Sequence, residues 1–339
     1  MNKGLQNLKR AFMKRYSERI LYAMPYQIIA RRIPSRITIE PTNLCNLRCP
    51  LCPVNTTMKR ARGNMTLENF KFIVDSLHPK TKHIDLFLAG EPLLNKNVFK
   101  MARYAADKGK KVLISTNATF LDKYVDEALD SGVDRIMLAI DGATEEVYLK
   151  YRINGDFKRS LKSIKMLCDR RKGKKASRPE IIIQFIVMKH NEHQIDDMIK
   201  LGKDLGVDRV ELKSASLNSL KTEDEKMKLK DDWLPANQEY SRYTVDGNNI
   251  KIKHDPNYCY WIWSSAIHWN GDITTCCYDM NGDHTFLNVF KMNGYQNAWK
   301  SKEYGKARKD MLKRRLKLCK TCNISDGYYT KSIELNKKQ

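Results

Sequence analysis

Six apolar, β-rich runs that alternate with helix-like segments constrain the fold of this chain more than any other feature of its sequence. Near-continuous apolar strands separated by helices indicate a parallel sheet covered by helices. Six units are too few for the usual closed barrel of eight strands, so the sequence predicts an α/β fold, a partial (β/α)6 TIM-like barrel that is open on one side. The runs are ITIE (37–40), HIDLFLAG (83–90), KVLIST (111–116), RIMLAID (135–141), IIIQFIVM (181–188) and RVELK (209–213), with helix-like segments at 66–78 (opened by Thr66), 96–109, 120–131, 145–171 and 191–206.

The other parts of the chain are expected to flank this barrel. Apolar residues at helical spacing between basic ones predict a basic helical extension, for which packing on the main domain is preferred to membrane contact. A polar stretch with a turn at Asp246-Gly247 indicates a connector before a second, cysteine-bearing module. The predicted parts are the extension at 1–33, the barrel at 34–213, the connector at 214–250, the small cysteine-rich domain at 251–332 and a Lys-rich tail at 333–339.

Charge and cysteine content narrow the class of partner and the compartment. Lys and Arg total 62 against 39 Asp and Glu, and the net charge of +23 favours anionic partners. The nine cysteines are clustered and odd in number, which favours metal ligation in a reducing compartment over a secreted disulfide scaffold. The sequence has no secretory pattern and no apolar run of about eighteen residues, so we expect a cytoplasmic protein without a transmembrane segment.

Three cysteines, Cys45, Cys49 and Cys52, directly follow the first predicted strand. They are therefore expected on the loop at its carboxyl end, where parallel α/β folds build their active sites. Closed metal sites use four protein ligands, so three thiols indicate a metal centre with one coordination position left for another molecule. The alternative is a zinc site that borrows a remote ligand.

The three cysteines resemble the signature of the radical S-adenosylmethionine (SAM) enzymes, Cys-x3-Cys-x-aromatic-Cys after the first strand of a six-unit partial barrel. Leu51 stands where the family usually has an aromatic residue and retains an apolar contact. The resemblance implies that the three thiolates hold a [4Fe–4S] cluster whose fourth iron is chelated by SAM. It also implies reductive cleavage of SAM to methionine and a 5′-deoxyadenosyl radical, which abstracts a hydrogen atom from the substrate.

Motifs at the ends of the next strands extend this resemblance over residues 34–213. Taken singly, each motif is an ordinary turn or cap. Their joint occurrence at successive strand ends is specific, and the resemblance implies that they bind SAM. The expected SAM-binding residues are Gly90, Glu91 and Pro92 after the second strand, Ser115 and Asn117 after the third, and Asp141 and Arg152 at and beyond the fourth, with Leu51 in the cysteine loop.

The C-terminal module holds four further cysteines, Cys259, Cys276, Cys319 and Cys322. By spacing alone they suit either a closed iron–sulfur cluster or a zinc ribbon. Cys259, eleven residues, Gly271, four residues and Cys276 resemble the opening of a SPASM or twitch domain. Because no cysteine follows Cys322, the resemblance implies one auxiliary [4Fe–4S] cluster rather than two.

The predicted function is oxidation of a sugar or cyclitol, including phosphorylated or nucleotide-linked ones, since the pattern looks most like aminocyclitol dehydrogenases and glycan-pathway SPASM enzymes. Alternatives are an epimerase with Cys277 as hydrogen donor, a ribosomal-peptide-modifying enzyme and, more distantly, a non-catalytic zinc or nucleic-acid-binding protein. Cys277 also suits a buried neighbour or an alternate ligand, whereas Cys168 is expected to be structural. We expect an anionic small-molecule or peptide substrate and a flavodoxin- or ferredoxin-like electron donor as partners, but not nucleic acid. The sequence does not identify a general base: the candidates near predicted strand ends, where polar residues are also routine, are Glu40, His190, Glu211 and Lys213.

Overall fold

The computed structural model describes residues 32–217, 223–247, 249–253, 259–320, 322 and 330–335. Nearly all of the predicted N-terminal extension, residues 1–33, therefore lies outside the described residues. No described helix is both long enough and apolar enough to cross a membrane.

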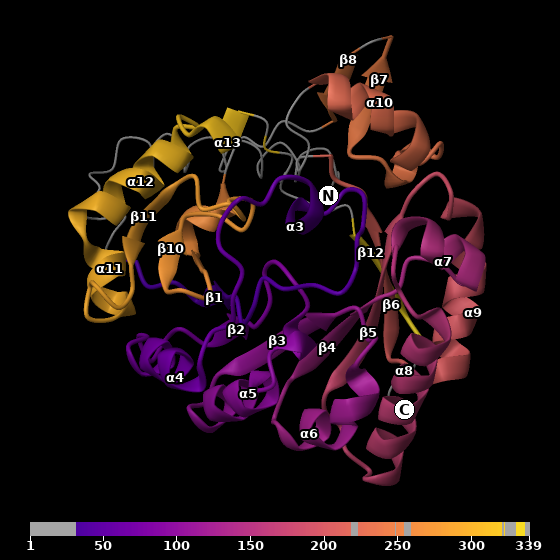
Figure 1. The fold of residues 1–339 in the computed structure, drawn as a ribbon, viewed down its shortest axis with the longest axis horizontal. Helices are drawn as coiled ribbons and strands as arrows, with labels where there is room; N and C mark the ends of the chain where they lie inside the picture. Colours follow the sequence, from indigo (N-terminus) through magenta and orange to yellow (C-terminus); the bar gives the residue numbers. More distant parts are fainter. Residues whose placement is uncertain are drawn as a thin grey trace, which may run out of the picture.

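A ten-stranded sheet organises the described chain, in the order β11-β10-β9-β1-β2-β3-β4-β5-β6-β12. Its six central strands run parallel to one another, as the alternating pattern predicts, and Figure 1 shows them arranged as an arc. The α/β partial-barrel fold is thus confirmed. The central strands are β1 (Arg36–Ile39), β2 (His83–Asp85), β3 (Lys111–Thr116), β4 (Arg135–Ala139), β5 (Glu180–Val187) and β6 (Arg209–Ser214).

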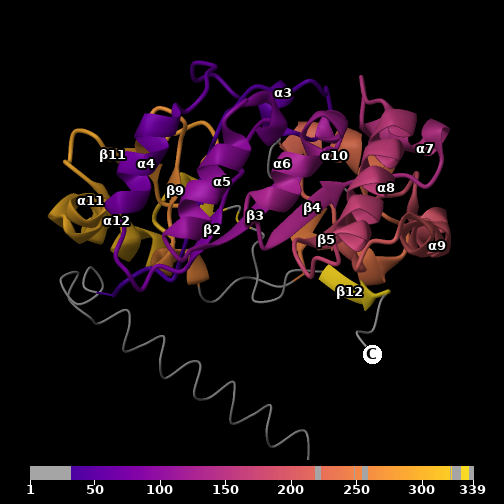
Figure 2. The ribbon, with the colours of Figure 1, turned by 90° about the horizontal axis from the view of Figure 1, so that it is seen from below.

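Helices between these strands cover the outer side of the arc, which Figure 2 shows from below. They are α4 (Leu67–Asp75), α5 (Val98–Asp107), α6 (Val125–Asp130), α7 (Glu145–Tyr151), α8 (Phe157–Gly173) and α9 (Ile195–Leu205). Thr66 caps α4 as expected, since its Oγ1 accepts a hydrogen bond from Asn69 N at 3.1 Å. The helix expected at 145–171 is two helices, because Asn154 has a φ of 65° and Asp156 caps α8.

Alternation along the strands separates an apolar outer face from a polar inner one. On β1, Ile37 and Ile39 belong to the core under the helices, whereas Thr38 and Glu40 alternate with them. On β6, Val210 and Leu212 belong to that core, whereas Glu211 and Lys213 alternate with them. The inner side of the arc therefore carries charged and polar groups, which a molecule bound there would contact.

The C-terminal region covers both edges of the arc. On one side, β9 (Ala266–Ile267) runs parallel to β1, and β10 (Asp272–Thr274) and β11 (Thr285–Asn288) continue the sheet. On the other side, β12 (Thr330–Glu334) pairs antiparallel with β6, so this strand spans the boundary expected between the cysteine-rich module and the tail. The helices of this region are α11 (Tyr295–Lys300), α12 (Lys302–Leu312) and α13 (Lys317–Lys320).

The segment expected as a polar connector, 214–250, contains regular structure. It holds helix α10 (Glu223–Trp233) and the antiparallel hairpin of β7 (Tyr243–Asp246) and β8 (Asn249–Ile252). The turn predicted at Asp246-Gly247 joins the two strands of this hairpin. Leu234 and Tyr243 pack in the same apolar cluster as Leu47, Cys49 and Leu51, so this segment contacts the cysteine loop.

Candidate functional site

The loop that follows β1 brings Cys45, Cys49 and Cys52 together at the carboxyl end of the sheet. Burial raises the pKa of Cys45 to about 12 and that of Cys52 to about 11, and neighbouring thiols add to both shifts. Thiols in such surroundings ionise when a bound metal supplies positive charge, and soft thiolates suit iron–sulfur clusters. Leu51 is buried in the apolar cluster beside Cys49, so the residue that replaces the family's aromatic does retain an apolar contact.

The loop after β2 rests directly on the cysteine loop. Glu91 N donates to Leu44 O at 2.7 Å, and Gly90 has a φ of +77°. A Cβ at Gly90 would lie 2.5 Å from Leu44 O, so only glycine allows the two backbones to approach this closely. Pro92 follows this contact and begins the short 3-10 helix η1 (Pro92–Leu94).

Glu91 connects the same loop to β3. Its carboxylate accepts hydrogen bonds from Leu93 N (3.0 Å), Thr116 Oγ1 (2.5 Å) and Asn117 N (2.7 Å). Burial raises the pKa of Glu91, and these hydrogen bonds act in the opposite direction. The resemblance implied that Glu91 binds SAM, and here both of its carboxylate oxygens accept hydrogen bonds from protein donors. Asn117 also reaches the cysteine loop, since its Nδ2 donates to Asn46 Oδ1 at 3.0 Å.

We predict that Gly90→Ala lowers both stability and cluster content. The left-handed backbone costs an alanine about 1–2 kcal/mol, and the clash with Leu44 O displaces the loop that carries Cys45. Iron and sulfide per chain after anaerobic reconstitution, together with the thermal unfolding midpoint, measure the two effects. Gly109→Ala is the matched control, because Gly109 has a similar φ of +69° but a Cβ there meets nothing within 4 Å. Equal iron content in the two variants would contradict this account.

A buried ion pair extends the site to β4. Asp141 Oδ2 accepts from Arg152 Nε at 2.6 Å, and Asp141 Oδ1 accepts from Ile186 N at 2.7 Å on β5. Arg152 Nη1 lies 3.7 Å from Cys49 Sγ. Burial alone would lower the pKa of Arg152, but Asp141 and Cys49 raise it well above its ordinary value, so the guanidinium stays charged beside the thiol. Ser115 lies on β3 two residues before Asn117, at a half-buried position.

The four C-terminal cysteines also lie near one another. Burial raises the pKa of Cys259 to about 12, and Cys276, Cys322 and Cys319 act on it as well. Cys276 and Cys319 are buried against Ile262, Met311 and Leu312. In the described ranges, no group of three or more His, Cys, Asp or Glu is placed to hold a single metal ion. Thiolates at the corners of a four-iron cluster stand farther apart than the ligands of one ion.

The two remaining cysteines have different surroundings. Cys168 is buried on α8 within the main core, as expected of a structural residue. Cys277 is half-buried, directly follows Cys276 in the chain and acts electrostatically on Lys213 of β6. Among the cysteines of the C-terminal module, Cys277 is thus the one whose charge is felt on the inner side of the barrel.

Of the candidates for a general base, two are engaged in ion pairs. Glu40 is fully buried and accepts from Arg60 Nη1 at 2.8 Å and Trp269 N at 3.1 Å. Glu211 pairs with Arg209 at 3.0 Å. Burial, then Lys150 and His193, lower the pKa of His190 to about 4, and its ring contacts Trp233 of α10.

Arg60, which the sequence did not single out, joins the barrel to the C-terminal module. Besides Glu40, it contacts Met280 O through Nε at 2.5 Å. The neighbouring Lys59 N donates to Asn281 Oδ1 at 2.8 Å, and Asn281 Nδ2 donates to Thr57 O at 2.7 Å. The stretch after Cys52 is therefore bonded to the stretch after Cys277, which fixes the two cysteine groups relative to each other.

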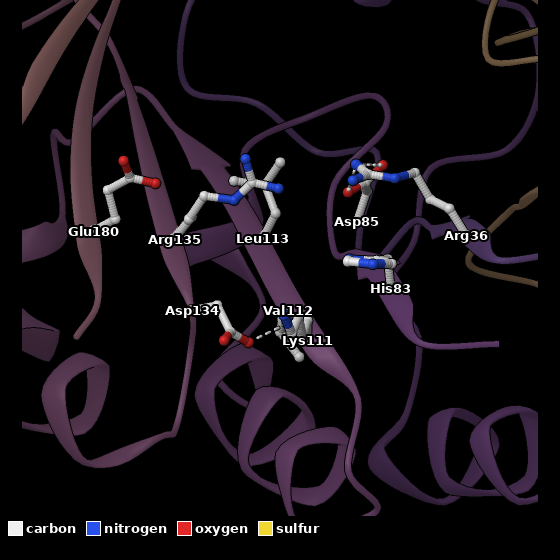
Figure 3. Close-up of a pocket in the computed structure, with 9 residues that line it drawn as sticks. All are labelled: Arg36, His83, Asp85, Lys111, Val112, Leu113, Asp134, Arg135 and Glu180. Atoms are coloured by element: carbon white, nitrogen blue, oxygen red, sulfur yellow. Dashed lines mark hydrogen bonds and ion pairs between the residues drawn. The ribbon is translucent and has the colours of Figure 1, made fainter. Parts of the chain in front are cut away.

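A charged cavity of about 310 Å³ lies at the opposite, amino ends of the strands (Figure 3). Its carboxylates are already paired, Asp85 with Arg36 at 2.8 Å, Asp134 with Arg178 at 3.0 Å and Glu180 with Arg209 at 3.3 Å. None of the seven predicted iron–sulfur ligands lines this cavity. The cavity is therefore separate from the cysteine site.

Comparisons with known proteins agree with the two cysteine groups. Residues 39–202 match the Radical SAM superfamily, and residues 259–323 match the SPASM iron-sulfur cluster-binding domain. An AdoMet-dependent heme synthase of Methanosarcina barkeri is 35% identical over 175 residues, which cover 51% of this chain and 48% of that protein. The chain thus spans about half the length of the curated relatives it matches first.

Two solved structures share the fold. Streptococcus suis SuiB bound to the precursor peptide SuiA superposes with a TM-score of 0.61 and 16% identity, covering 96% of this chain and 77% of SuiB. BtrN in complex with AdoMet and 2-DOIA superposes with a TM-score of 0.53 and 17% identity, covering 86% of this chain and 94% of BtrN.

The chain therefore carries a radical SAM domain followed by a C-terminal SPASM domain, as the cysteine patterns predicted. A radical SAM domain binds a [4Fe–4S] cluster together with SAM, and a SPASM domain binds auxiliary iron–sulfur clusters.

Proposed function

We propose that this protein is a radical SAM enzyme that oxidises an alcohol carbon of an anionic small molecule, with a sugar or cyclitol as the first choice. The observation that supports the proposal is the placement of the two cysteine groups. The Cys49 loop follows β1 at its carboxyl end, and the thiol of Cys277 acts electrostatically on Lys213 of β6. A substrate on the inner side of the barrel would be within reach of both groups.

In this proposal, Cys45, Cys49 and Cys52 hold the SAM-binding cluster. Gly90 allows the β2 loop to lie against the cysteine loop, and Pro92 begins the 3-10 helix that follows. Leu51 supplies apolar packing, while Glu91 orients the β3 end with Ser115 and Asn117. Arg152, oriented by Asp141, holds positive charge beside Cys49, where an anionic cluster or the SAM carboxylate is stabilised by it.

Cys259, Cys276, Cys319 and Cys322 are proposed to hold one auxiliary cluster. The burial of Cys276 and Cys319 against Ile262 and Met311 keeps water away from them, and burial is one of the factors that set the potential of an iron–sulfur centre.

When bound, SAM and its cluster supply a 5′-deoxyadenosyl group able to take a hydrogen atom from a carbon of the substrate. The overall reaction balances as one SAM and one secondary alcohol giving methionine, 5′-deoxyadenosine, one ketone and one proton. The chain's own residues bind and orient the alcohol, and a side chain at the barrel mouth accepts the hydroxyl proton. A flavodoxin- or ferredoxin-like protein is proposed as the electron donor.

Anaerobic reconstitution followed by product analysis tests this function. We expect about eight irons per chain and formation of 5′-deoxyadenosine from SAM in the presence of dithionite. With a panel of deuterated sugar and cyclitol phosphates, the true substrate transfers deuterium to 5′-deoxyadenosine and loses two hydrogens. A reconstituted protein that never forms 5′-deoxyadenosine would refute the proposed chemistry, and about four irons would remove the auxiliary cluster from it.

Peptide modification is the second candidate, and the fold match to SuiB with its precursor peptide favours it. The same deuterium assay separates the two candidates. If deuterium reached 5′-deoxyadenosine from a deuterated peptide encoded by a neighbouring gene, and from none of the sugar or cyclitol phosphates, peptide modification would replace alcohol oxidation as the proposed function.

Epimerisation is distinguished by Cys277, whose thiol acts electrostatically on Lys213 of β6. If the thiol returns a hydrogen atom to the substrate, Cys277→Ala abolishes product while 5′-deoxyadenosine is still formed. For an oxidation we predict instead that Cys277→Ala keeps product formation within about threefold of the wild type, because the small apolar replacement disturbs packing only modestly. Mass spectrometry of the product measures this, since oxidation removes two hydrogens and epimerisation removes none.

A further inference from the structure

We propose that Lys213 and Arg242 form a binding site for a phosphate or carboxylate group of the substrate, at the barrel mouth between the two cysteine groups. This inference rests on the proposed function and gives its substrate a required chemical feature. It starts from two cations that the catalytic roles above leave unused.

Lys213 is placed by the sheet. It pairs with Ile186 of β5, and the backbone N–H of Ile186 donates to Asp141 at 2.7 Å. Lys213 is thus one strand away from the Asp141–Arg152 pair that contacts Cys49. Because its neighbour Leu212 belongs to the core under the helices, Lys213 belongs to the inner side of the arc.

Arg242 approaches the same place from the segment between β6 and the C-terminal module. Only 4% of the residue is exposed, and its Nε donates to Ser214 O at 3.2 Å, next to Lys213. Its backbone is fixed by a bond from Lys253 N at 2.9 Å. Two cationic side chains from separate elements therefore meet at the carboxyl end of β6.

The acids nearby are already paired with other cations. Asp141 pairs with Arg152 at 2.5 Å, and Glu211 pairs with Arg209 at 3.0 Å. Within the described ranges, the side chain of Lys213 has no hydrogen bond or ion pair, and the side chain of Arg242 has only its bond to Ser214 O. Burial, followed by the charge of Arg242, lowers the pKa of Lys213. Arg242 is buried and Lys213 is half-buried. Two neighbouring cations that are largely withdrawn from water are stabilised by a counter-ion, so an anionic group from a ligand would complete the arrangement.

The position of this pair fits the substrate. Cys277 acts electrostatically on Lys213, so a group bound there lies on the side of the barrel that faces the auxiliary cysteines. Arg152 beside Cys49 is a separate cation for the SAM side. An anionic group held by Lys213 and Arg242 would place the rest of the substrate between the SAM side and the auxiliary cysteines.

Calorimetric titration of small anions tests the site. Pyrophosphate, inorganic phosphate and malonate are titrated into the reconstituted, SAM-saturated protein at fixed ionic strength. We expect one saturable site in the wild type, weakened about tenfold or more by Lys213→Gln and by Arg242→Gln, and largely restored in Lys213→Arg. Lys111→Gln, at the amino end of β3, is the matched control and should bind within about twofold of the wild type. Iron content of each variant reports folding.

Tighter binding of pyrophosphate than of malonate would indicate a phosphorylated substrate, and the reverse order a carboxylate; both support the site. Wild-type protein that binds none of the three, or Lys213→Gln that binds as well as wild type, would overturn it. Displacement of SAM by the anions would also overturn it, because the cations would then belong to the SAM site. Formation of 5′-deoxyadenosine is measured in parallel, so loss of the proposed function is seen separately from loss of this site.

Discussion

Replacing Cys49 with alanine is expected to reduce 5′-deoxyadenosine formation to the level of a control without protein. Cys49 is buried in the middle of the cysteine loop, beside Leu51 and within 3.7 Å of Arg152. Without its thiolate, two cysteines remain on this loop, and the SAM-binding cluster loses one of its three protein ligands. Iron should fall from about eight to about four per chain, because the auxiliary ligands are untouched.

Cys168→Ala is the matched control for this variant. Cys168 is as buried as Cys49, but it packs in the main core on α8, away from both cysteine groups. We expect a loss of about 1 kcal/mol of stability, with iron content and SAM cleavage unchanged. Full iron content in Cys49→Ala, or equal loss of iron in both variants, would show that Cys49 does not bind the cluster.

The barrel and its first cysteine loop were accessible from sequence because both depend on local patterns. Apolar runs such as 181–188 bury both faces of a strand, and their alternation with helices leaves few other topologies. Since parallel strands place their carboxyl ends at one edge, Cys45 and Asp141 had to lie near each other once the strands were recognised.

The contacts between distant segments were not accessible in this way. The Glu40–Arg60 pair joins the two ends of the loop that carries Cys45, Cys49 and Cys52. The bonds of Met280 and Asn281 to the same loop join residues more than 200 positions apart. Polar residues at such positions resemble solvated ones in a sequence, because only the fold shows that Glu40 is fully buried.

Two elements were hidden by their composition. Helix α10 carries many charges, and its few apolar residues, Leu229 and Trp233, contact a small cluster rather than the main core. Strand β12 is mostly polar and becomes a strand by pairing with the edge of β6. Strand formation at an edge depends on the partner strand more than on intrinsic propensity, so β12 has no clear signal in the sequence. The many charges of α10 hid its helical period.

Replacing Asp141 with leucine is expected to lower the free energy of unfolding by about 3–5 kcal/mol, which corresponds to a fall of about 4–7 °C in the unfolding midpoint of a chain of this length. Asp141 is fully buried, and its removal leaves the guanidinium of Arg152 without its counter-ion and Ile186 N without its acceptor. Because Arg152 lies beside Cys49, the iron of the first cluster should also be lost more readily to a chelator. Thermal unfolding and iron release to a chelator measure the two effects.

The double variant Asp141→Leu/Arg152→Met separates lost charge pairing from lost packing. Removing both charges leaves no uncompensated ion, so the double variant should recover much of the stability that the single variant loses. It should not recover SAM cleavage, because the cation beside Cys49 is gone. If the double variant were as unstable as Asp141→Leu, the cost would come from packing or from the bond to Ile186, and the ion pair would not be what orders this end of the barrel.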